Sequence, residues 1–200
     1  LMTWPVDVLA GSWYVGGGIG IAKADDAGQN INDSLGALAN LGVTSSFTYD
    51  DTASSVSAFG GYKFNEIFAL EGDYDYLGRY RVNATFSSGG FSGLATEEDT
   101  VGAISASAVF TAPIPGPVTI FGKAGVAEAS ISETCSATVF TCDSATNTNA
   151  GGIFGIGMDI RIHSAAIRIE YDGFTNIGDK VNDYSVGAFS VIKVEGMYIF

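Results

Sequence analysis

Apolar and polar residues alternate with a period of two along most of this chain. In the last nine residues, IKVEGMYIF, every second position from Ile192 onward is apolar or glycine, while the intervening positions include Lys193 and Glu195. Such alternation predicts β-strands with one polar and one apolar face. The predicted strands are long enough to cross a membrane at a tilt. They cover residues 12–23, 53–64, 66–77, 99–111, 117–128, 150–162, 165–173 and 185–200.

The connections between these segments alternate in length. Outer-membrane barrels show this pattern, because their periplasmic turns are short and their extracellular loops are long. The sequence therefore predicts an all-β fold, an eight-stranded antiparallel up-and-down transmembrane β-barrel that forms one domain over residues 1–200. Short connections are expected near residues 63–66, 111–117 and 161–165, and long ones near residues 25–52, 78–99, 130–149 and 173–184.

The charged residues of the predicted strands share one parity. In a soluble barrel this face would meet water, whereas in a membrane barrel it is turned inward. The inward arrangement is favoured because the apolar face carries aromatic residues near the strand ends and small residues between them, as a lipid-facing wall does. The periplasmic girdle is expected to contain Phe64, Phe68, Phe110, Tyr198 and Phe200, and the outer girdle Tyr74, Tyr76, Phe154 and Tyr171.

An eight-stranded barrel has just enough room inside for side chains. Inward charges must therefore pair, because unpaired buried ions are very costly. The bulky inward Tyr14, Phe59, Phe121 and Phe189 favour a filled, salt-bridged lumen, and a conducting lumen is the alternative. The expected network of interior charges consists of Glu71, Asp73, Lys123, Asp159, Arg161, Arg168, Glu170, Lys193 and Glu195, while Asp75 and Asp172 share the same parity.

Several segments resemble, in order, the transmembrane barrel of the outer membrane protein A family. GGYKFNEIFALEGDYDYLGR (residues 60–79) looks like a turn-and-strand unit of that family, and RIEYDGFTNIGD (residues 168–179) looks like its seventh strand and last loop. The resemblance implies a barrel in the outer membrane of a Gram-negative bacterium, surrounded by lipid and lipopolysaccharide, without the family's periplasmic peptidoglycan-binding domain. Tyr198 and Phe200 look like the signal that the barrel-assembly machinery reads.

The resemblance also implies roles for interior residues. Glu71 and Arg168 match a charged pair inside the family's barrel, and Asp159 matches another interior acid. The usual basic partner of that acid is missing from the fourth strand, which reads ISASAVF. Lys123 or Lys193 is therefore expected to pair with Asp159.

The amino-acid composition limits the classes of partner and ion that the protein is expected to bind. The net charge is −13 and the nine Lys and Arg residues are scattered, which argues against nucleic-acid binding. Acidic residues in the predicted loops favour solubility, and Ca²⁺ or Mg²⁺ bridges to anionic lipid headgroups are the alternative.

Cys135 and Cys142 are too few for a zinc site. They predict a disulfide worth roughly 2.5 kcal/mol, in an oxidising compartment. No metal or cofactor motif is present.

Two further features bear on function. The only histidine, His163, lies in a predicted short turn without an orienting acid, so an enzyme is not expected. Ile31, Leu35 and Leu38 predict a short amphipathic helix within residues 31–42, which could bind a partner or pack on its own loop. The leading hypothesis is a structural and surface-interaction protein that presents its extracellular loops to an extracellular protein or a neighbouring barrel. A small porin-like channel for ions or solutes is the alternative.

Overall fold

The computed structural model describes residues 11–25, 44–112, 114–138, 143–177 and 188–200. Within these ranges the chain forms nine strands, and all strand pairs are antiparallel. In the same ranges no helix is long and apolar enough to cross a membrane. The strands are β1 (Ser12–Asp25), β2 (Thr44–Tyr49), β3 (Thr52–Lys63), β4 (Phe68–Ser88), β5 (Phe91–Ala112), β6 (Val118–Ala137), β7 (Ala145–Ile162), β8 (Ala165–Thr175) and β9 (Ala188–Ile199).

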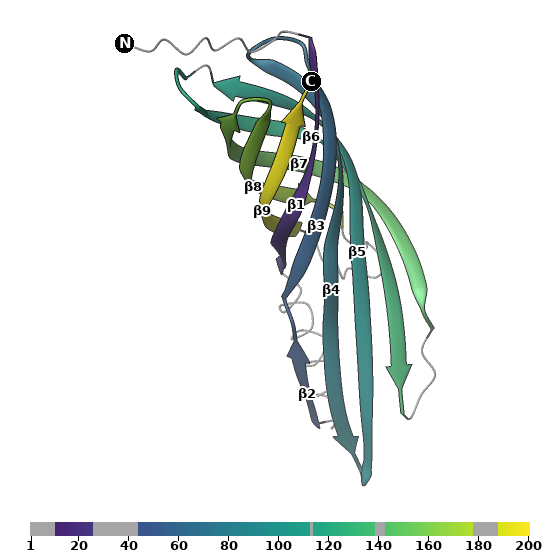
Figure 1. Cartoon of the computed structure of the whole chain (residues 1–200). Coiled ribbons are helices and arrows are strands. Elements are labelled where there is room, and N and C mark those ends of the chain that lie inside the picture. Colours follow the sequence, from purple (N-terminus) through teal and green to yellow (C-terminus); the bar gives the residue numbers. More distant parts are fainter. Residues whose placement is uncertain (1–10, 26–43, 113, 139–142, 178–187) are drawn as a thin grey trace.

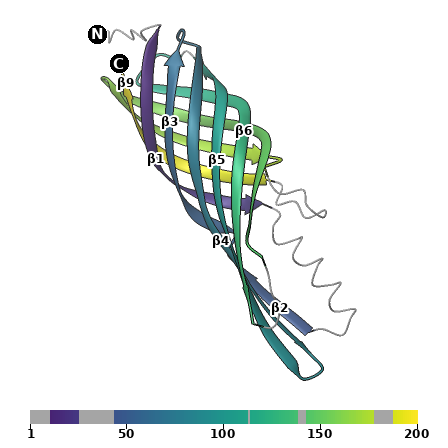
Figure 2. The same ribbon diagram turned by 90° about the vertical axis from the view of Figure 1, so that its right-hand side faces the viewer.

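Eight strand positions close into a barrel over the described part of the chain. β2 and β3 both pair with β4, at different heights, and so share one position. The ring runs β3, β1, β9, β8, β7, β6, β5 and β4, and returns to β3 (Figures 1 and 2). At the seam between β1 and β9, the backbone N–H of Phe200 donates to the carbonyl of Trp13 at 3.0 Å. The predicted eight-stranded antiparallel barrel is confirmed.

The strands on one side of the barrel are longer than predicted. The expected loop at residues 78–99 is wrong, because β4 and β5 continue through it as a hairpin with Gly89 and Gly90, both at positive φ, at its tip. β6 and β7 likewise extend into the expected loop at residues 130–149. Ser and Thr alternate there with small or apolar residues. Thr favours strands, but this alternation lacks the contrast of charged against apolar residues that marked the other strands.

The barrel is inside-out relative to a soluble protein. On β9, Lys193 is 1% exposed whereas its neighbour Ile192 is 60% exposed. Val194 and Phe200 are also exposed, and Arg168 on β8 is buried. The apolar parity therefore forms the outer wall, and the charged parity fills the interior, as expected for a barrel whose wall meets lipid.

The outer wall carries an apolar belt that ends in an aromatic girdle at the short turns. On β1 the belt runs from Trp13 to Ile21, which spans about 20 Å along the axis of a tilted barrel, near the height of a membrane barrel's apolar band. Adjacent ring pairs, with centroids 4.9–5.5 Å apart, follow the girdle around the wall: Trp13–Tyr62, Tyr62–Phe64, Phe64–Phe68 and Phe68–Phe110.

Three predictions fall on residues outside the described ranges. These are the helix within residues 31–42, Cys142 of the expected disulfide, and the start of the last strand at residues 185–187. They remain predictions.

Candidate functional site

The interior of the barrel is layered. A layer of buried charges lies between two clusters of apolar residues, one near the short turns and one near the long connections. The cluster near the short turns includes Tyr14, Phe59 and Phe121, which were expected to point inward. The other cluster includes Phe189, also expected inward, and is larger. It contains Ala22, Ala24, Leu77, Tyr80, Val101, Ala103, Ala127, Ala129, Ile131, Ile153, Phe174, Ile177, Phe189 and Val191.

Arg168 on β8 lies in the part of the charged layer nearest the short turns. Its Nη1 atom donates to Glu71 Oε2 at 2.8 Å, and its Nε atom donates to Asp159 Oδ1 at 2.9 Å. The guanidinium lies 4.3 Å from the ring centroid of Phe121 and 4.8 Å from that of Phe59. Arginine suits this place because its planar group can pair with carboxylates and stack on aromatic rings together.

Lys123 on β6 lies at the centre of the layer, within ion-pair distance of four carboxylates. Its Nζ atom lies 3.2 Å from both Asp73 Oδ1 and Asp172 Oδ2, 3.7 Å from Glu71 Oε1, and closest to Glu170. The neighbouring strand β7 leaves room for the Lys123 side chain at Gly155. A Cβ on Gly155 would overlap the Asp172 carboxylate and the methylene groups of Lys123. A side chain other than hydrogen at residue 155 would therefore displace this pair.

Lys193 on β9 holds the part of the layer nearest the long connections. Its Nζ atom lies 2.7 Å from Asp172 Oδ2, 3.1 Å from Asp75 Oδ1 and 3.7 Å from Glu195 Oε1. Glu195 also accepts a hydrogen bond of 2.5 Å from the Ser57 hydroxyl on β3. Three cations thus link acids from β4, β7, β8 and β9 across the lumen, and β3 adds the Ser57 hydroxyl. Unpaired ions would be too costly in such a dry layer.

The pairing differs from the sequence-based expectation at Asp159. Neither Lys123 nor Lys193 pairs with it, and that prediction was wrong; Arg168 bridges Asp159 and Glu71 instead. The physical reason is register, since Asp159 and Arg168 are directly opposite each other on β7 and β8. Arg161 is half-buried, and the ion pairs found among the described residues do not include it.

Two members of the layer were visible in the sequence but left out of the expected network. Asp75 and Asp172 share the inward parity, and the structure places both against Lys193. Both acids lie at the edge of the layer nearest the long connections. This position depends on the stagger between strands, which the sequence does not show. Ser57 carried no charge signal at all. Among the described residues, no group of three or more potential ligands is arranged to hold a metal ion.

Beyond the barrel wall, β2, β4, β5 and β6 continue as a sheet on the side of the long connections, here called the extracellular sheet (Figure 2). A register shift between Tyr76 and Gly78 inserts Leu77 into β4 and reverses the parity beyond it. Arg79 and Arg81 consequently point outward, whereas Tyr80 is buried. Without this bulge the two arginines would continue the inward parity of Glu71 and Asp75.

The inward face of the extracellular sheet combines apolar and acidic residues. Asp99 on β5 is directly opposite Glu133 on β6 and shares its face with Glu97. Burial, together with the charges of Glu97 and Glu133, raises the pKa of Asp99 to about 7. Farther from the barrel this face carries the half-buried residues Phe47, Tyr49, Val82, Ala84, Phe86 and Ala95.

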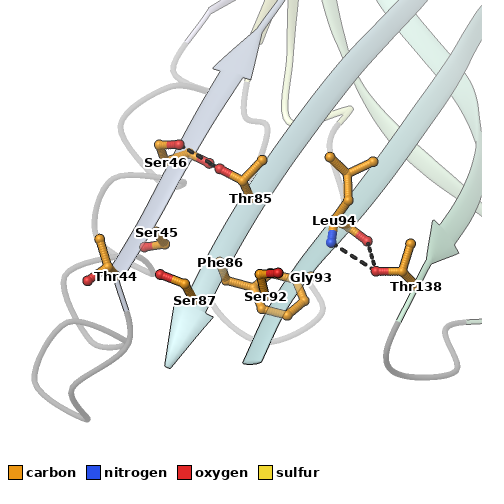
Figure 3. Close-up of a pocket in the computed structure, with 10 residues that line it drawn as sticks. All are labelled: Thr44, Ser45, Ser46, Thr85, Phe86, Ser87, Ser92, Gly93, Leu94 and Thr138. Atoms are coloured by element: carbon orange, nitrogen blue, oxygen red, sulfur yellow. Dashed lines mark hydrogen bonds between the residues drawn. The ribbon is translucent and has the colours of Figure 1, made fainter. Parts of the chain in front are cut away.

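The outward face of the extracellular sheet and the adjoining end of β7 carry mainly hydroxyl side chains, and this surface is here called the hydroxyl face. A groove of about 500 Å³ lies at the far end of the sheet and is lined by residues of β2, β4 and β5 together with Thr138 (Figure 3). Ser46 and Thr85 share a hydrogen bond of 2.6 Å across β2 and β4, and Thr138 contacts the backbone of Leu94. The hydroxyl face consists of Thr44, Ser46, Thr48, Thr85, Ser87, Ser92, Thr96, Ser132, Thr134, Ser136, Thr138, Thr146 and Thr148.

Solved outer-membrane barrels are similar to this structure. Neisserial surface protein A is 17% identical, with a TM-score of 0.60, over 95% of this chain and 99% of that one. OprG from Pseudomonas aeruginosa is 12% identical, with a TM-score of 0.57, over 96% of each chain. Ail of Yersinia pestis, in complex with the heparin analogue sucrose octasulfate, is 15% identical, with a TM-score of 0.50, over 96% of this chain and 100% of that one. These identities establish likeness of fold alone.

The sequence itself gives the family. A search among curated proteins finds no significant match. The model of the OmpA-like transmembrane domain, however, matches residues 9–200. Because this match spans nearly the whole chain, the protein belongs to the OmpA-like transmembrane domain family and is a barrel of the Gram-negative outer membrane.

Proposed function

We propose that this protein is a structural and surface-interaction barrel that presents its extracellular sheet to a protein partner. The observation that carries the proposal is the continuation of β2, β4, β5 and β6 past the barrel wall as a paired sheet rather than as loose loops. A paired sheet loses little conformational entropy when it binds, which favours recognition. The barrel itself serves as its anchor in the membrane.

The inward face of the extracellular sheet supports a protein with apolar and basic groups as the partner. Phe47, Val82 and Phe86 remain partly exposed there, and aromatic side chains in such positions supply much of the binding energy of interfaces. Glu97 and Glu133 add negative charge at the base of this face. The same charge disfavours a sulfated polyanion such as the ligand bound to Ail.

A shortened hairpin tests the proposal. Arg81 and Glu98 are directly opposite each other, so residues 82–97 can be replaced by Asn-Gly, which forms a two-residue hairpin turn. We expect cells of a non-adhesive Gram-negative host that display the intact protein to bind extracellular-matrix proteins or a second barrel, and cells with the shortened variant to lose this binding. The variant should keep heat-modifiable mobility, which reports a closed barrel. Equal binding by both proteins would overturn the proposal.

A channel is the second candidate, and the charged layer is the observation in its favour. The apolar cluster that includes Leu77, Val101 and Phe174 lies across the lumen on one side of that layer, and the cluster that includes Phe121 lies on the other. Both argue for a filled lumen, since ions do not cross packed apolar side chains. Planar-bilayer conductance of the intact protein and of Glu71→Ala decides between the two. Silence of both removes the channel, and a conductance that changes with the substitution establishes it.

The proposal includes no catalytic role. His163 is exposed in the tight turn between β7 and β8, with φ of 58°, at the barrel end opposite the extracellular sheet. A lipid-modifying barrel would need its base near the outer leaflet beside a nucleophile. An unchanged lipid profile on overexpression is the expected result, and a new lipid species would contradict it.

Two residue roles complete the proposal. We infer that Tyr198 and Phe200 form the assembly signal, because both are exposed on the outer wall at the short-turn end, beside the seam that must close last. We also infer that Cys135, near the end of β6, pairs with Cys142 and restrains the connection to β7. Mass mapping of alkylated peptides with and without reductant tests this disulfide.

A further inference from the structure

Two cations lie at the short-turn end of the lumen, which faces the periplasm in an outer-membrane barrel. Lys63 is the last residue of β3, and Arg161 is the last residue but one of β7. Both have the inward parity of their strands, and Lys63 is only 9% exposed. Within the described ranges no acid forms an ion pair with either residue. Lys63 and Arg161 are here called the periplasmic cation pair.

The two members of the pair face each other across the barrel. Three strands, β4, β5 and β6, separate β3 from β7, so these strands occupy opposite positions in the ring. The interior of an eight-stranded barrel is just wide enough for side chains, and the charge of Arg161 acts on Lys63. Two positive charges therefore converge at the periplasmic end of the lumen and repel each other.

The neighbouring acids do not neutralise the pair. Asp159 precedes Arg161 by two residues on β7, but both of its oxygens accept hydrogen bonds from Arg168, at 2.9 and 3.4 Å. Glu66, in the turn after β3, is exposed and takes no part in the ion pairs of the described residues. A cation that is buried without a counter-charge is costly. The pair therefore indicates an anion that comes from outside the protein.

The anion has to approach from the periplasm. On the other side of the pair, the apolar cluster that includes Phe121 closes the lumen. Hydroxyl groups that can donate to an anion lie at the same end of the barrel. Ser12 is the first residue of β1, and Thr111 and Thr119 are inward residues on either side of the short turn between β5 and β6.

We propose that the periplasmic cation pair binds a carboxylate that enters from the periplasm. The guanidinium fork of Arg161 fits the two oxygens of a carboxylate, and the ammonium group of Lys63 adds a second positive charge. A flat carboxylate reaches the deeply placed Lys63 more easily than a tetrahedral phosphate does. Two sources supply this chemistry, the free C-terminus of an extended peptide and a small organic acid. The site is independent of the proposed function, because it lies at the barrel end opposite the extracellular sheet.

The test uses the full chain, refolded in phosphatidylcholine nanodiscs, which leave both ends of the barrel open to solution. Calorimetric titration measures the binding of acetyl-trialanine with a free C-terminal carboxylate, of its C-terminal amide, of acetate and of inorganic phosphate. Lys63→Met and Arg161→Met each remove one cation and keep a long side chain. Lys23→Met is the matched control, because Lys23 is an exposed cation near the extracellular end of β1.

We expect Lys63→Met and Arg161→Met each to bind the peptide carboxylate about tenfold more weakly, as the loss of a charge-assisted hydrogen bond implies. Lys23→Met should bind it as the intact protein does, and the amide should not bind. Acetate that binds as tightly as the peptide would assign the site to small acids, and tighter binding of the peptide would assign it to chain ends. Equal binding of carboxylate and amide, unchanged binding by both variants, equal weakening by Lys23→Met, or tighter binding of phosphate would overturn the proposal.

Urea unfolding gives a second check that does not depend on the peptide. Lys63→Met breaks no ion pair of the described residues, so in chloride it should keep or raise the unfolding midpoint. Acetate at equal ionic strength should raise the midpoint of the intact protein, because a ligand that binds only the folded form stabilises it, but not that of Lys63→Met. A lower midpoint for Lys63→Met in chloride would reveal a partner within the protein. That result, or an equal effect of acetate on both proteins, would refute the site.

Discussion

Lys193→Leu removes the cation that, among the described residues, forms the ion pairs of both Asp75 and Glu195. In this variant Asp172 still has an ion pair with Lys123, at 3.2 Å, and Glu195 still accepts the hydrogen bond from the Ser57 hydroxyl. Two buried carboxylates are thus left without a cation. Breaking a buried pair from one side costs about 3–5 kcal/mol, so we expect the free energy of unfolding to fall by about that amount. The neighbouring Ile192→Leu faces lipid and conserves volume, and should cost less than about 1.5 kcal/mol.

Urea unfolding in lipid vesicles, followed by tryptophan fluorescence, measures both variants under one condition. A double variant, Lys193→Leu with Asp75→Asn, adds an internal check. Asp75→Asn alone breaks a 3.1 Å pair and should destabilise the barrel, yet in the Lys193→Leu background it removes an unpaired charge and should restore stability. Equal losses for Lys193→Leu and Ile192→Leu, or strictly additive losses in the double variant, would refute the inward charged layer.

Three further predictions follow from the wall, the seam and the extracellular sheet. A Cβ on Gly157 would lie 2.5 Å from the Phe121 ring, so Gly157→Ala should lower the urea-unfolding free energy by about 1–3 kcal/mol, whereas Gly196→Ala, with open space around it, should not. Phe200→Ala should slow assembly into membranes by the purified assembly machinery while spontaneous refolding keeps its rate; equal slowing of both would contradict the signal role. The folded-state pKa of Asp99, about 7, exceeds its ordinary value of 3.8, so ionisation opposes folding and the extracellular sheet should lose stability between about pH 4 and 7; hydrogen exchange corrected for intrinsic rates should show this loss, and Asp99→Asn should abolish it.

The periodicity of the chain determined the strands and their faces. Side-chain direction alternates with every residue of a strand, so Lys193 and Ile192 had to face opposite sides whatever the fold around them. The aromatic residues at the strand ends then indicated lipid on the apolar side. Both conclusions depend only on local geometry, which explains why the strands of the membrane-spanning part could be derived from sequence.

Tertiary structure decided the pairing of the charges and the shape beyond the wall. Which acid meets Arg168 depends on the register between β7 and β8, and a shift of two residues would leave every side chain on its face but change each partner. The bulge at Leu77 likewise turns Arg79 outward without any mark in the hydrophobic pattern. The β4–β5 hairpin escaped prediction because its Ser and Thr residues form strands only when neighbouring strands supply hydrogen-bond partners. Local sequence thus sets which way a side chain points, whereas the closure of the barrel sets what it meets.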